Sequence, residues 1–190
     1  MLPMSLRIAI DVDETVAPTL EAFLGIFNKE RGTSYRSDEF TSFDVYKCMK
    51  KEHADILYEM FESSDVWDEV WLKTAPYPKS KKAIQEMLSR GNEVFFVSNC
   101  YHSTHSGKSK WLQDNFGVGY KNHIYTAHKD LLLVDYLIDD NTDWIKNSIA
   151  TRVLITRPWN CNDITGFDCR VNDVYDAWLK INELERGNDY

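Results

Sequence analysis

The stretch RIAIDVDETVAP, residues 7–18, decides how the fold of this chain is interpreted. Small and apolar residues lead to a point where Asp11, Asp13 and Glu14 stand within four positions. Three acidic groups so close together repel one another and are costly to remove from water. Such a cluster persists if it faces solvent or if a cation holds it together.

The length and composition indicate a globular chain that acts on small molecules. The 190 residues are enough for one α/β domain with a sizeable core, alone or with a small insertion. Hydrophobic residues make up 43% of the chain, which argues against disorder. The net charge of −8 argues against binding of duplex nucleic acid, which requires a basic surface. A small phosphorylated substrate is still compatible because local charge can oppose the net sign.

From the residues given, we expect neither a signal peptide nor a membrane span. The N-terminal residues MLPMSLRIAI are too short and too soon charged for a signal peptide, and no stretch approaches the ~18 apolar residues of a membrane span. We therefore expect a cytoplasmic protein without a membrane partner. The four cysteines form no C-x-x-C pair, which favours reduced thiols. They are Cys48, Cys100, Cys161 and Cys169.

Five short apolar segments are typical of buried strands. They are residues 6–11, 93–98, 122–126, 136–139 and 152–156. Helical patterns lie between or after them, at residues 78–91, 107–117, 141–150 and 173–187. This alternation predicts a parallel sheet covered by helices on both faces.

One section interrupts the alternation of strands and helices. Residues 17–75 contain no strong strand pattern, but residues 20–32 and 51–63 carry apolar residues at helical spacing. The sequence therefore predicts a helical insertion between the first strand and the rest of the sheet.

Polar residues follow the predicted strands at their carboxyl ends, where the active crevice of an open parallel sheet lies. They are Asp11 and Asp13, then Ser98 and Asn99, then Asp139 and Asp140. Ligands that are all oxygen atoms suit Mg²⁺, which also retains water and phosphate oxygens in its coordination shell. A divalent cation would explain how the acidic cluster after the first strand persists.

These residue types could carry out phosphoryl transfer. A carboxylate beside Mg²⁺ stays ionised and can attack phosphorus to form an aspartyl phosphate. A second carboxyl two residues on could protonate the leaving oxygen and then activate water. The phosphoryl oxygens also need donors and positive charge, which the Ser98 hydroxyl and the Lys129 ammonium could supply.

In order and spacing, these residues resemble the four motifs of haloacid dehalogenase-type phosphatases. The motifs are DVDET at 11–15, Ser98, Lys129 and YLIDD at 136–140. The resemblance implies a Rossmann-like core domain, residues 1–16 and 76–190, in which helices flank a parallel sheet. It also implies that residues 17–75 form a small helical cap domain.

Within that superfamily the chain is similar to the 5′(3′)-deoxyribonucleotidases. The similarity extends over DVDET, over KDLLLVDYLIDD at 129–140 and over KSKWLQDNFG at 108–117. Two positions depart from the pattern. Glu14 stands where the family often has glycine, and Ser98-Asn99 replaces the more common Thr-Ser or Thr-Ala.

The resemblance implies a role for each motif residue. Asp11 would be the nucleophile and a metal ligand, and Asp13 the general acid and base that lends its backbone carbonyl to the metal. Asp140 would bind Mg²⁺, and Asp139 would orient Lys129 or a water on the metal. The phosphoryl group would be bound by Ser98, Asn99 and Lys129.

The expected activity is Mg²⁺-dependent hydrolysis of deoxyribonucleoside monophosphates. The resemblance implies an aromatic pocket for the base in the cap, and we expect Phe23, Phe43 and Trp67 to form it. Arg157-Pro158-Trp159-Asn160, after the last predicted strand, receives no role. The expected partner is a small nucleotide, and a homodimer is compatible with the sequence.

Two alternatives are left open. The same core could hydrolyse or transfer the phosphate of another small ester or of a polynucleotide 3′ end. The chain could instead be a non-catalytic phosphate-binding module similar to a receiver domain, which also gathers carboxylates, a hydroxyl and a lysine at strand ends.

Overall fold

The computed structural model of the protein describes residues 5–99 and 104–187. A six-stranded sheet lies at its centre in the order β3-β2-β1-β4-β5-β6, and every pair of neighbouring strands is parallel. The first strand has a partner on each side, since Ile8 pairs with Val94 of β2 and with Tyr136 of β4. The strands are β1 (Arg7–Ile10), β2 (Glu93–Ser98), β3 (His123–Tyr125), β4 (Tyr136–Asp139), β5 (Thr151–Ile155) and β6 (Cys169–Val171).

All five predicted strands are present, and their parallel arrangement is confirmed. The sixth strand, β6, was not predicted. It has three residues at the edge of the sheet, and each is only partly buried. A strand this short and this exposed carries no apolar run by which a sequence pattern could reveal it.

The two faces of the sheet are covered unequally. Helices α4 (Ser80–Ser89), α5 (His105–Phe116) and α7 (Val174–Gly187) pack with Ile8 and Ile10 in one large core. Ala9 points to the other face, where it lies in a smaller cluster with Ile145. The helix on that face is α6 (Thr142–Ile145).

The predicted helix over residues 141–150 is wrong in length, because α6 ends at Ile145. Ser148 instead forms a turn, in which its backbone N–H donates to Ile145 and its hydroxyl accepts from Ala150. Ile149, within the predicted helix, is 81% exposed. The chain needs this turn in order to enter β5 at Thr151.

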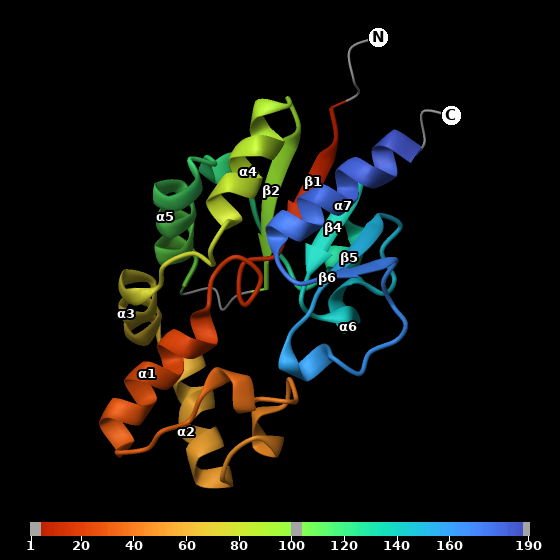
Figure 1. Ribbon diagram of the computed structural model, residues 1–190. Coiled ribbons are helices and arrows are strands. Elements are labelled where there is room, and N and C mark those ends of the chain that lie inside the picture. The colour runs from red at the N-terminus through yellow and green to blue at the C-terminus, as the bar shows by residue number, and fades with distance from the viewer. Residues whose placement is uncertain (1–4, 100–103, 188–190) are drawn as a thin grey trace.

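The insertion after β1 is helical, as predicted. Helices α1 (Thr19–Arg31), α2 (Lys51–Glu62) and α3 (Ser64–Lys73) lie together beyond the carboxyl ends of the strands (Figure 1). Helix α3 was not predicted separately. Ser63 ends α2 and caps α3 by accepting from Val66, so two helices follow one another without a loop. The division into a core domain (1–16 and 76–190) and a cap domain (17–75) stays a prediction.

Other expectations are tested only in part. Cys48, Cys161 and Cys169 are free thiols, whereas Cys100 lies outside the described residues. Within 5–99 and 104–187 no helix has both the length and the apolar character that crossing a bilayer requires. The cytoplasmic location and the homodimer stay predictions.

Candidate active site

The acidic cluster after β1 forms a tight turn. The Asp11 N–H donates to the carbonyl of Ile138 in β4 at 2.8 Å, which ties the end of β1 to its neighbour. The carbonyl of Val12 accepts from Val16 and Ala17, both at 3.0 Å. Glu14 takes a left-handed conformation with φ of 57°. Glycine adopts this conformation without strain, whereas the Cβ atom of Glu14 makes it unfavourable.

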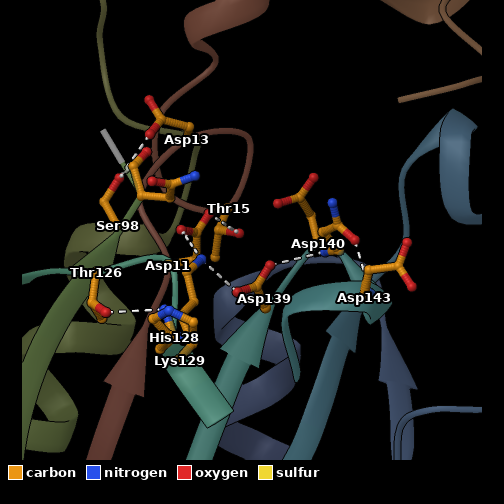
Figure 2. A network of polar contacts seen from close by, with 12 residues as sticks. Asp11, Asp13, Thr15, Ser98, Thr126, His128, Lys129, Asp139, Asp140 and Asp143 are labelled. Carbon is orange, nitrogen blue, oxygen red and sulfur yellow. Dashed lines mark hydrogen bonds and ion pairs between the residues drawn. The ribbon is translucent and has the colours of Figure 1, made fainter. Parts of the chain in front are cut away.

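Asp11 and Asp139 meet at one buried lysine. The Nζ atom of Lys129, in a 3₁₀ turn between β3 and β4, lies 2.5 Å from Asp11 Oδ1 and 2.6 Å from Asp139 Oδ2. Figure 2 shows the two carboxylates converging on this amine. The lysine is 2% exposed, so its charge depends on these partners.

Asp140 completes a group of three carboxylates. One oxygen each of Asp11, Asp139 and Asp140 lies within 4.8 Å of the others, and all three residues are buried. Three carboxylates against the single ammonium of Lys129 leave two negative charges, which one divalent cation would neutralise. The donor set therefore fits Mg²⁺.

Burial and mutual repulsion raise the pKa values of two carboxyls in this group, those of Asp11 and Asp140. Burial raises the pKa of Asp11 to about 7, although Lys129 lowers it, and Asp139 and Asp13 raise it further. Burial and the neighbouring charge of Asp11 also raise the pKa of Asp140. Both shifts are typical of several carboxylates buried close to one another.

Asp13 belongs to a second polar cluster beside the first. Its Oδ2 atom accepts from the Ser98 hydroxyl at 2.9 Å and from the Lys108 ammonium. Lys108, on α5, also donates to Ser98 Oγ at 2.7 Å and is fully buried. The sequence motifs assigned no role to Lys108. The only signal for it was its place in the KSKWLQDNFG stretch.

A cavity of about 300 Å³ opens from Asp13 toward the helical insertion. The three aromatic residues expected for a base pocket all line it, together with Asn99. Phe23 and Trp67 are buried with their rings edge to face at 4.6 Å, whereas Phe43 is 60% exposed. Trp159 lines the same cavity, although segment 157–160 had received no role.

Comparison with known proteins identifies the family. The family model described as "5' nucleotidase, deoxy (Pyrimidine), cytosolic type C protein" matches residues 4–184. The chain belongs to this family. The 5'(3')-deoxyribonucleotidase of Clostridium acetobutylicum is 22% identical over 171 residues, which cover 90% of this chain and 91% of the relative.

Solved structures confirm the fold of this nucleotidase family member. A haloacid dehalogenase-like hydrolase of Streptococcus pneumoniae superposes with a TM-score of 0.59 at 12% identity, covering 93% of this chain and 98% of the other. YfnB of Bacillus subtilis, bound to magnesium, has the same TM-score at 10% identity, covering 94% and 100%. The protein is therefore a phosphoric monoester hydrolase of the haloacid dehalogenase superfamily, and the non-catalytic alternative is not supported.

Proposed function

We propose that this nucleotidase is an Mg²⁺-dependent 5′(3′)-deoxyribonucleotidase that removes phosphate from deoxyribonucleoside monophosphates through an aspartyl phosphate on Asp11. The observation that carries the proposal is the meeting of Asp11, Asp139 and Asp140 in one buried cluster, next to Asp13, which lines an aromatic cavity. The activity named for the Clostridium acetobutylicum relative supports the choice of substrate.

The hydrogen bonds of the two adjacent aspartates favour different roles for them. Both carboxylate oxygens of Asp139 accept hydrogen bonds from the protein. Oδ2 accepts from Lys129, and Oδ1 accepts from the Asn141 N–H at 2.9 Å. Asp139 would thus orient Lys129. Asp140, whose Oδ2 accepts from Trp159, would hold Mg²⁺ through Oδ1. Asp11 would hold Mg²⁺ as well, as the resemblance to the family motif implies. When bound, Mg²⁺ would offset the carboxylate charge and polarise the phosphoryl oxygens.

The proposed reaction has two steps. A carboxylate oxygen of Asp11 forms a bond to phosphorus while the ester P–O bond breaks, and Asp13 gives its proton to the leaving alkoxide. In the second step water attacks phosphorus, Asp13 takes a proton from it, and the bond to Asp11 breaks. Ser98, Asn99 and Lys129 would bind the phosphoryl oxygens, and the ammonium of Lys108 lies close enough to Ser98 to join them.

The environment of Asp13 supports its role as the acid and base. Oδ2 is held by Ser98 and Lys108, but Oδ1 is buried and has no hydrogen-bond partner among the described residues. An unpaired buried oxygen is costly, and the leaving oxygen of a substrate or an attacking water would supply the missing partner. The backbone carbonyl of Asp13 stays a predicted metal ligand.

The cavity supports a substrate with a planar base. Phe23, Phe43 and Trp67 would contact the base, and stacking on an aromatic side chain is worth about 1–3 kcal/mol per base. A cavity of about 300 Å³ can hold a small ring system.

The test is phosphate release from dTMP and dUMP in Mg²⁺, with UMP, sugar phosphates and a 3′-phosphorylated oligonucleotide for comparison. We expect hydrolysis of the deoxyribonucleotides that EDTA abolishes and that Asp11→Asn reduces at least about a thousandfold. Asp143→Asn is the matched control, because this aspartate lies near the site in sequence but its side chain is 80% exposed. Turnover of another ester without turnover of deoxyribonucleotides would favour the alternative substrates.

A further inference from the structure

The segment Arg157–Asn160 follows β5. It makes hydrogen bonds to two parts of the active site. It contains a short 3₁₀ helix, Pro158–Asn160. Arg157 Nε donates to the carbonyl of Glu14 at 2.6 Å, and Asn160 Nδ2 donates to the carbonyl of Asp140 at 2.6 Å. The segment thereby connects the turn after β1 to the end of β4.

Asn160 makes this connection rigid. It is 2% exposed, and its amide nitrogen also donates to the carbonyl of Ile155 at 2.7 Å. Its Oδ1 atom accepts from the Arg157 N–H and from Arg170 Nη1, both at 3.0 Å. Two donors and two acceptor sites of the amide are therefore all in use, which fixes the side chain and the turn around it.

The side chain of Trp159 extends from this turn to Asp140, the proposed metal ligand. Its Nε1 atom donates to Asp140 Oδ2 at 2.9 Å. Its ring lines the cavity and meets Phe43 edge to face, with 6.4 Å between centroids and 80° between planes. One side chain thus contacts both the carboxylate cluster and the wall of the cavity.

We propose that Trp159 is a positioning residue for Asp140 and a wall of the substrate cavity, so that it joins cation binding to recognition of an aromatic base. The inference rests on the proposed function. An indole N–H can only donate, so Trp159 holds Oδ2 without competing as a ligand and leaves Oδ1 of Asp140 for the cation. Partners of this kind set the orientation of a metal ligand, and their loss typically weakens metal affinity 10–100-fold.

The first experiment measures Mg²⁺ binding to the nucleotide-free protein by isothermal titration calorimetry. Trp159→Phe removes the N–H donor but keeps an aromatic ring, and we expect its Mg²⁺ Kd to rise about 10-fold or more. Trp178→Phe is the matched control, because Trp178 also donates its indole N–H to a carboxylate, that of Glu86 at 3.1 Å, in the core behind the sheet. The control should lose stability but bind Mg²⁺ as the wild type does.

The outcomes separate this inference from the proposed function. If the wild type binds no Mg²⁺ and hydrolyses no nucleotide, the proposed function fails. If the wild type binds Mg²⁺, Asp140→Asn abolishes binding and Trp159→Phe binds within twofold of the wild type, only the role of Trp159 fails. Because Trp159 is only partly buried, Trp159→Phe should keep the fold, which circular dichroism and thermal unfolding check.

The second experiment tests the cavity wall and does not depend on Trp159→Phe. KM for dTMP is measured at saturating Mg²⁺ for Phe43→Leu, for Trp159→Leu and for the double variant. If the two rings act as one wall, the double variant should raise KM by less than the product of the single effects. A rise equal to the product of the two single effects, or an unchanged KM in both single variants, would overturn this part of the inference.

Discussion

At the scale of single residues, Glu14 combines an unfavourable backbone conformation with several favourable hydrogen bonds of its side chain. Its left-handed φ of 57° strains any residue with a Cβ atom. Its carboxylate compensates by accepting from the Leu20 N–H at 2.6 Å and from the Tyr77 hydroxyl at 2.9 Å. Leu20 lies in the first turn of α1, and Tyr77 lies where the chain returns from the helical insertion.

This balance predicts which of two variants at position 14 is the more stable. Glu14→Ala loses the hydrogen bonds and keeps the backbone strain, whereas Glu14→Gly loses the same bonds but relieves the strain. We expect Glu14→Gly to have a free energy of unfolding about 1 kcal/mol higher than that of Glu14→Ala. Urea denaturation of both proteins measures the difference, and an equally stable or more stable alanine variant would contradict it.

Lys108 is a buried cation next to Asp13, the proposed acid and base. It is fully buried, donates to Asp13 and Ser98, and its Nζ atom lies 5.1 Å from the ring centroid of Trp67. Lys108→Met keeps the length of the side chain but removes the charge. We expect kcat/KM for dTMP to fall about 100-fold or more, because a donor beside the reacting groups is lost.

Lys110 provides the control for this variant on the same helix. Its side chain is 77% exposed and pairs with Asp114 at the surface. Lys110→Met should leave kcat/KM within about twofold, since exposed ion pairs contribute little. Equal effects of the two substitutions would show that Lys108 has no particular role in the reaction.

At the scale of elements, the close approach of α3 to α5 brings Trp67 next to Lys108. Gly107 permits this approach. A Cβ atom on Gly107 would lie 2.9 Å from Asp68 Oδ1 and 3.2 Å from Trp71 Cδ1, both on α3. A side chain at this position would therefore displace the Asp68 carboxylate and the Trp71 ring.

Replacement of this glycine tests the contact between the helices. Gly107→Ala should lower the free energy of unfolding by about 1 kcal/mol and raise KM for dTMP, because displacing the Asp68 carboxylate and the Trp71 ring outweighs the gain in helix propensity. Gly25→Ala on α1 is the control, since a Cβ there meets nothing within 4 Å. That substitution should be neutral or stabilise by up to about 1 kcal/mol through helix propensity. Thermal and urea unfolding measure both effects, and an unchanged Gly107→Ala protein would contradict the close packing of α3 on α5.

At the scale of the whole molecule, the site joins segments that are far apart in the chain. Carboxylates from β1 and β4 share one lysine from the turn between β3 and β4. The cavity beside them is lined from the helical insertion as well as from the strand ends. Any ligand of this site should therefore stabilise the fold as a whole.

The raised pKa values predict how that stabilisation varies with pH. Burial raises the pKa of Asp11 from 3.8 to about 7, and that of Asp140 also rises, so the metal-free folded state keeps protons that the unfolded chain has lost. Its free energy of unfolding should therefore fall as pH rises from about 4 through about 7. Mg²⁺ must displace these protons, and so it should bind more tightly at pH 8 than at pH 6. Thermal unfolding with Mg²⁺ and with EDTA checks this, and an equal gain in Tm at both pH values would contradict it.

The sequence by itself determined the sheet, the position of the helical insertion and the edge at which the acidic groups gather. Buried strands such as EVFFVS are evident from local sequence, and parallel strands place the residues at their carboxyl ends along a common edge. Asp11 and Asp139 were therefore expected at the same edge, and the pairing of β1 with β4 makes them neighbours. The three-residue β6 and the early end of α6 escaped prediction, because each depends on how the chain enters or leaves a neighbouring strand.

Only the tertiary structure decided which other side chains reach the site. Lys108 has the sequence surroundings of a surface helix, and its burial results from the packing of α3 on α5. Trp159 lies 19 residues from Asp140, and Asn160 and Arg170 hold the turn that aims it. Such contacts depend on the simultaneous placement of several elements, whereas a strand or an acidic motif depends on neighbours along the chain.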